Sequence, residues 1–100
     1  MKFKLFQDED NAPTQTTLRS SGPHVITWSR IGTGEFVGSV NPPLPAGTFV
    51  QWTNVDVYLE KGVEMSIQDP STLHVRTMDK GVLTDGILEE LQVVFELDIP

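Results

Sequence analysis

The chain has 100 residues, a length typical of one domain, and 38% of them are hydrophobic, which favours a globular rather than a disordered protein. It contains no cysteine, which excludes disulfides and thiolate metal sites, and its 14 acidic and 7 basic residues give a net charge of −7. That charge argues against partners such as nucleic acids or anionic membranes and suits a basic protein partner.

The first predicted element is a strand over residues 2–6. Its two lysines resemble the start of a secretory signal, but the run Gln7-Asp8-Glu9-Asp10 replaces the apolar segment that a signal peptide needs. We therefore expect no signal peptide, and no apolar run approaches the ~20 residues of a membrane helix. The acidic cluster lacks the glycine and distal glutamate of an EF-hand, so we expect a solvated loop there rather than a calcium site.

The next predicted elements are a threonine-rich strand over residues 14–19 and a hairpin. In the hairpin, residues 25–30 and 35–40 flank a glycine-containing loop. The proline-rich residues 41–47 follow. Since proline cannot donate to a central ladder, this segment must lie between strands or along an edge, where it could carry the chain to a second sheet.

Alternation then predicts strands over residues 49–53, 55–60, 63–68, 73–78 and 91–99, with Lys61-Gly62 as a tight turn between the second and third. Residues 69–71 and 79–81 are predicted turns. Residues 84–90 are the only helical candidate, with Thr84 or Asp85 as the cap. In the last strand, one face carries Leu91, Val93, Phe95, Leu97 and Ile99.

About seven or eight short strands at this spacing predict an all-β fold, a single β-sandwich over residues 1–100 of immunoglobulin-like or jelly-roll architecture. The side chains expected to be largely buried in its core are Trp28, Phe36, Phe49, Val93, Phe95 and Leu97.

No arrangement of side chains in the sequence is typical of an active site, and we expect no catalytic residue, cofactor or metal. His24 and His74 lack a second ligand at metal spacing, and His74 alternates onto an exposed face with Arg76. The glycines of residues 32–34 lie in a hairpin and not before a helix, so they do not form a phosphate loop. An enzymatic function is therefore not expected.

The aromatic residues leave a binding function open. Trp52 lies between the polar Gln51 and Thr53, and Tyr58 follows in the next predicted strand. Exposed on a sandwich face, these rings could stack on sugars; buried, they would be core residues.

Six segments in order resemble a family of small proteins encoded among the virion genes of tailed phages and prophages. These segments are residues 12–18, 26–30, 32–38, 48–50, 85–88 and 93–100, with sequences such as APT, WSR, GEFVG and DGIL. The chain departs from the family pattern at residues 95–98, which are more acidic, and at residues 55–68.

The resemblance implies a non-enzymatic virion structural or accessory protein: a capsid decoration, head-fibre or tail-fibre component, assembled in the host cytoplasm. Its partners would be other virion proteins or copies of itself. The alternative is a carbohydrate-binding module that recognises a host-surface glycan. The strands over residues 1–6 and 91–99 are the expected contact elements. The individual contact residues expected are Lys2, Lys4, Pro42, Pro43, Pro45, Trp52 and Tyr58.

Overall fold

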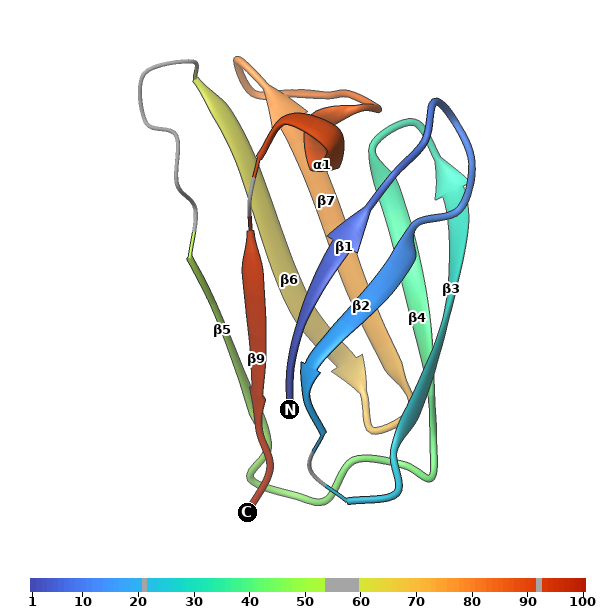
Figure 1. The fold of residues 1–100 in the computed structure, drawn as a ribbon, viewed down its shortest axis with the longest axis vertical. Coiled ribbons are helices and arrows are strands. Elements are labelled where there is room, and N and C mark those ends of the chain that lie inside the picture. Colours follow the sequence, from blue (N-terminus) through green and yellow to red (C-terminus); the bar gives the residue numbers. More distant parts are fainter. Residues whose placement is uncertain (21, 54–59, 92) are drawn as a thin grey trace.

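The computed structural model describes residues 1–20, 22–53, 60–91 and 93–100. Two antiparallel sheets face each other across the core (Figure 1), which confirms the predicted all-β sandwich. The first sheet has the order β2-β1-β9-β5 and the second β3-β4-β7-β6, with the short β8 added beside β7.

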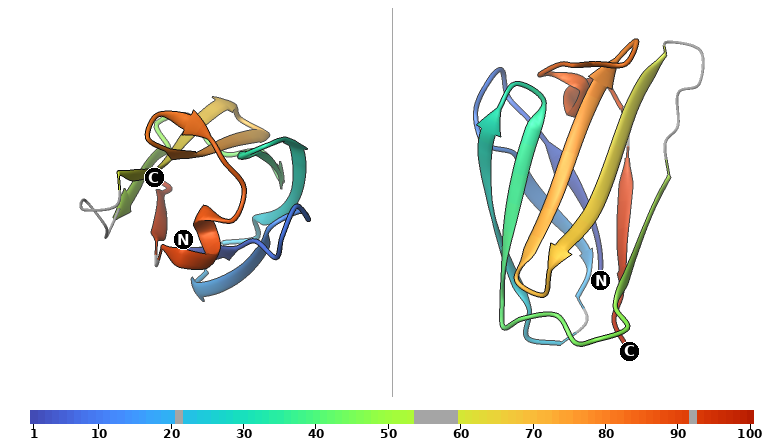
Figure 2. Two further views of the ribbon diagram at one scale, coloured as in Figure 1. Left: turned by 90° about the horizontal axis from the view of Figure 1, so that it is seen from above. Right: turned by 180° about the vertical axis from the view of Figure 1, so that it is seen from behind.

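The first sheet consists of β1 (Lys2–Phe6), β2 (Thr14–Arg19), β5 (Phe49–Thr53) and β9 (Val94–Asp98). The second consists of β3 (Val25–Gly32), β4 (Glu35–Asn41), β6 (Lys61–Asp69), β7 (Thr72–Asp79) and β8 (Val82–Leu83). A single helical turn, α1 (Ile87–Glu90), covers one end of the sandwich between β8 and β9 (Figure 2). Among the described residues, no helix has the length and apolarity required to cross a membrane.

The core is built from alternate strand positions, as the period-two pattern predicts. The ring of Phe95 stacks on that of Phe3 at a centroid distance of 5.6 Å, and Trp28 approaches Phe3 at 6.0 Å. The prediction of burial is confirmed for Phe36, Val93, Phe95 and Leu97, whereas Trp28 is half-buried and packs against the margin of the core.

The predicted burial of Phe49 is wrong, because its side chain is 54% exposed. Residues three apart on a strand point to opposite faces, so Phe49 and Trp52 cannot both point inward. The pairing of β5 with β9 sets the choice: Trp52 lies opposite the buried Phe95, and Phe49 lies opposite Asp98 on the outer face.

The predicted turn at Lys61-Gly62 is also wrong. Both residues belong to β6, where they pair with Asp79 and Met78 of β7. The left-handed backbone occurs one residue earlier, at Glu60, whose φ is 56°. Of the strand predicted over residues 55–60, Glu60 lies in a turn, and residues 55–59 fall outside the described residues.

The proline-rich segment carries the chain from β4 in one sheet to β5 in the other, as expected. Leu44 is buried, and its backbone N–H donates to the carbonyl oxygen of Pro70 at 2.7 Å. This bond attaches the crossover to the turn between β6 and β7. The prolines that flank Leu44 remain exposed at this end of the sandwich.

Candidate functional site

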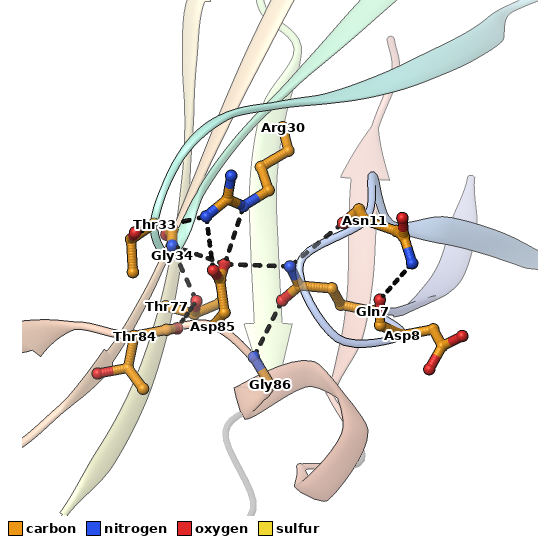
Figure 3. A network of polar contacts seen from close by, with 10 residues as sticks. All are labelled: Gln7, Asp8, Asn11, Arg30, Thr33, Gly34, Thr77, Thr84, Asp85 and Gly86. Atoms are coloured by element: carbon orange, nitrogen blue, oxygen red, sulfur yellow. Dashed lines mark hydrogen bonds and ion pairs between the residues drawn. The ribbon is translucent and has the colours of Figure 1, made fainter.

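A network of polar contacts centred on Asp85 holds the opposite end of the sandwich together (Figure 3). Arg30, on β3, donates to both carboxylate oxygens, with Nη2 at 2.7 Å from Oδ2 and Nε at 3.3 Å from Oδ1. The backbone N–H of Gly34, in the β3–β4 turn, donates to Oδ1 at 2.9 Å. One carboxylate therefore fastens the β3–β4 hairpin to the loop that precedes α1.

Gln7, which is fully buried, extends the network to the loop after β1. Its amide nitrogen donates to Asp85 Oδ1 at 3.0 Å and to the carbonyl oxygen of Asn11 at 3.2 Å. Its amide oxygen accepts the N–H of Gly86 at 3.0 Å. Gly86 is also the N-cap residue of α1, and no side chain accepts a hydrogen bond as a cap of this helix. The predicted capping role of Thr84 or Asp85 is therefore wrong. The carboxylate of Asp85 is instead used by Arg30, Gly34 and Gln7.

The contacts in this network keep Asp85 ionised. The hydrogen bond from the Arg30 side chain, followed by those from the Gly34 N–H and Gln7, lowers the pKa of Asp85 from 3.8 to about 2, against the opposing effect of burial. A general acid or base at neutral pH needs a pKa nearer to 7 and access to substrate. The network therefore acts as a structural clamp between the loops that it joins.

Replacing Asp85 by asparagine should make the free energy of unfolding depend less on pH in the acidic range. A carboxyl whose pKa is lowered on folding stabilises the protein above its unfolded pKa, and this contribution disappears as pH falls from about 4 to about 2. The shift corresponds to about 2 kcal/mol. Urea unfolding of Asp85→Asn at several pH values should show lower stability at pH 7 and a weaker decline below pH 4. Asp8→Asn, which removes an exposed carboxylate at the same end, should keep the wild-type slope; equal slopes in all three proteins would contradict the prediction.

Residues considered as metal ligands, in the acidic loop and at the histidines, make hydrogen bonds or ion pairs with other residues of the chain. In the described part of the chain, no group of three or more histidine or acidic side chains is placed to hold a metal ion. The Asp8 carbonyl oxygen accepts the N–H and side-chain amide of Asn11, which closes an exposed turn. His24 Nδ1 lies 2.8 Å from the Pro42 carbonyl oxygen.

His74 is less exposed than the sequence predicts. Its side chain is only 18% exposed and lies 4.0 Å from Glu35. The face assignment is correct, since Arg76 also points outward from β7 and pairs with Glu64 of β6.

The residues expected to make contacts do not form a single surface. Lys2 and Trp52 line the same shallow depression, of about 130 Å³, whereas Lys4 lines another one beside α1. The exposed prolines Pro42, Pro43 and Pro45 lie on the crossover at the proline-rich end. Tyr58 lies outside the described residues. Trp52 is 37% exposed, at the open edge of its sheet.

The two strands expected as contact elements lie in the interior of their sheet. Both β1 and β9 are central in their sheet, since β1 pairs with β2 and β9 while β9 pairs with β1 and β5. Their backbone groups are used within the sheet, so only their outer faces are open to a partner. The edges of the two sheets are β2, β5, β3 and β6.

Of these edge strands, β3 has the most exposed apolar side chains. Val25 and Ile31 are 64% and 57% exposed, and Thr27 and Ser29 between them are exposed as well. This surface was not among those predicted from the sequence. The signal was present, since the alternate positions of VITWSRIG carry no charge on one face, but only the strand order shows that β3 is an edge.

Comparison of the chain with protein-family models, with curated proteins and with solved structures found no match in any of the three.

Proposed function

We propose that this chain is a non-enzymatic structural or accessory component of a phage particle, such as a capsid decoration, head-fibre or tail-fibre component, that acts through protein–protein contacts. The observation that supports it best is the exposed edge of β3, an eight-residue strand that, among the described residues, has a strand partner on one side only.

An exposed strand edge presents a row of unpaired N–H and C=O groups that can pair with another chain. Soluble proteins usually block such edges with lysine, proline, a bulge or a covering loop. In β3 the protection is slight: the strand holds neither lysine nor proline, and its bulge falls only at Ile31, close to its end. Arg30, its one charged residue, is engaged by Asp85. An edge of this kind suits a protein that is paired in its working state.

The rest of the molecule fits a rigid building unit. Every buried side-chain nitrogen or oxygen of the described residues has a hydrogen-bond partner, and the Asp85 clamp joins three loops at one end. The part of the proposal that places the chain in a virion is supported by the resemblance of six of its segments to small phage proteins. Net charge of −7 suits association with a less acidic particle protein.

The test is whether the chain assembles at fixed stoichiometry. When it is co-expressed with the structural proteins encoded beside it, we expect it in the particle fraction at a constant ratio. Thr27→Lys, which places a charge on the β3 edge, should reduce incorporation. Ser66→Lys, an exposed site on β6 at the other edge of the same sheet, should not. Recovery of the chain only as free protein, absent from every particle fraction, would contradict the proposal.

A second candidate, carbohydrate binding, is supported by the depression that Trp52 lines together with Lys2, Gln51, Thr53, Val94 and Glu96. Polar side chains such as these can form hydrogen bonds with the hydroxyl groups of a sugar. The depression is small against the ~300–1,000 Å³ of typical ligand pockets. Trp52 also shares the inward face of β5 with its partner Phe95, so it does not offer a flat platform on the outer face. Glycan binding that is lost in Trp52→Ala would favour this candidate.

A further inference from the structure

The exposed side chains along β3 form a palindrome. From the start of the strand to its end, the outward positions are Val25, Thr27, Ser29 and Ile31, which read apolar, polar, polar, apolar. All four are uncharged. A strand with such a pattern is complementary to a second copy of itself when the two run in opposite directions.

We propose that two copies of the chain pair antiparallel through β3, around a two-fold axis that passes beside Trp28. In this register Val25 lies opposite Ile31 of the other copy, and Thr27 lies opposite Ser29. Cross-strand apolar pairs and threonine–serine pairs both stabilise a sheet. The inference rests on the proposed assembly function and names one partner for it, a second copy of the chain.

The pairing is isologous, since each strand supplies the same residues to the interface. It joins the two β3-containing sheets into one continuous sheet. The bulge in β3 falls at Ile31 and leaves residues 25–30 in regular register with β4, so the centre of the interface is straight ladder. Figure 2 shows β3 at the margin of its own sheet, next to β2 of the other sheet, to which Trp28 is joined by a hydrogen bond with Gln15.

The charge distribution permits this contact in spite of the net charge of −7. Arg30 points into the Asp85 clamp and not out of the edge. Glu35, on the neighbouring strand, lies 4.0 Å from His74, and its register partner Arg76 binds Glu64. Glu35 pairs with Gly32 at the end of β3, so it lies away from the proposed two-fold axis.

The antiparallel direction also separates the acidic ends. The loop that carries Asp8, Glu9 and Asp10 lies at the end where β3 finishes, since Gln7 and Arg30 both bind Asp85. The start of β3 lies at the proline-rich end, where His24 contacts the Pro42 carbonyl oxygen. Each acidic loop would then approach a proline-rich end of the other copy, whereas a parallel pair would bring two acidic loops together.

The other edge strands lack this pattern. The edge strand β6 carries Lys61, Glu64 and Asp69, and β2 ends at Arg19. The outward positions of β5 are Phe49, Gln51 and Thr53, which are uncharged but not palindromic.

Engineered cysteines test both the pairing and its register, because the chain contains none of its own. Directly opposite antiparallel residues have Cα atoms ~4.5–5.5 Å apart, within disulfide range, whereas diagonal neighbours lie ~7–8 Å apart. An equimolar mixture of Thr27→Cys and Ser29→Cys chains should therefore give covalent dimers on mild oxidation. Either variant alone should give few, since residue 27 faces residue 29 and not its own copy. Cross-linking that is equal in the single variants, or absent from the mixture, would overturn the register or the pairing.

Charge variants test the same register without a covalent bond. In T27K/S29E each lysine faces a glutamate of the other copy, whereas in T27K/S29K each faces a lysine. Sedimentation equilibrium should show dimerisation of the first and dimerisation weaker by roughly tenfold or more for the second. Circular dichroism of both variants checks that the fold is kept. Equal dimerisation, or none in either variant or the native chain, would contradict self-pairing.

The two proposals can fail separately. A chain that is incorporated into particles at fixed stoichiometry but never cross-links through residues 27 and 29 would retain the assembly function and lose the self-pairing. A chain that cross-links as expected but is absent from every particle fraction would retain the dimer and lose the virion function.

Discussion

Replacing Phe95 by alanine is expected to lower the free energy of unfolding by ~3–5 kcal/mol, enough to unfold a marginal domain outright. Phe95 is completely buried, its ring stacks on Phe3, and it lies on β9 at the centre of its sheet. The substitution removes the apolar area of the ring and leaves a cavity between two close-packed sheets, which the rigid strands cannot fill by collapsing. Urea unfolding followed by tryptophan fluorescence would measure the loss.

Phe49→Ala is the matched control, since it deletes the same ring from the same sheet. Phe49 is 54% exposed on the outer face of β5, so its loss should change stability by no more than about 1 kcal/mol. Similar losses of stability in the two variants would mean that Phe49 is buried in solution. The inward and outward faces of β5 would then be the reverse of those described.

The strands themselves were predictable, because half-buried strands alternate and the alternation survives in nearly every one of them. The burial of Phe95 and Leu97 followed directly from that period. Phe49 could not be placed in the same way. The five residues of β5 carry an aromatic side chain on each face, and only the pairing of Trp52 with Phe95 shows which face is inward.

Gly62 illustrates a second limit. A lysine–glycine pair between two apolar runs favours a turn, but β7 continues far enough to pair with it, and a ladder partner outweighs the local preference. Glu60 takes up the left-handed backbone instead.

The Asp85 clamp had no local signal at all. Its three principal side chains are separated by 55 residues between Arg30 and Asp85 and by 78 between Gln7 and Asp85. No spacing rule joins such distant positions, and Asp85 resembles an ordinary helix cap until the hairpin and the first loop are brought beside it. The β3 edge was hidden for a related reason, since strand order and not the strand's own sequence determines which strands are edges.

Gly34→Ala is expected to be the most damaging of the conservative glycine substitutions in the turns. Gly34 has φ +67°, a conformation that costs other residues ~1–2 kcal/mol. An added Cβ would also lie 2.6 Å from both the Thr77 carbonyl oxygen and the Thr84 nitrogen, so the backbones of β7 and the following loop would have to move.

Those same atoms hold the clamp end together: the Thr77 N–H donates to the Gly34 carbonyl oxygen at 2.8 Å, and the Gly34 N–H binds Asp85. Strain and overpacking together should cost roughly 3 kcal/mol or more, a fall in Tm of more than ~10 °C. Gly81→Ala separates the two causes, because Gly81 has φ +79° but nothing within 4 Å of the added Cβ. It should lose only the ~1–2 kcal/mol of backbone strain. Thermal unfolding of the two variants side by side gives the comparison, and equal losses would show that the close approach of Gly34 to Thr77 and Thr84 contributes nothing to stability.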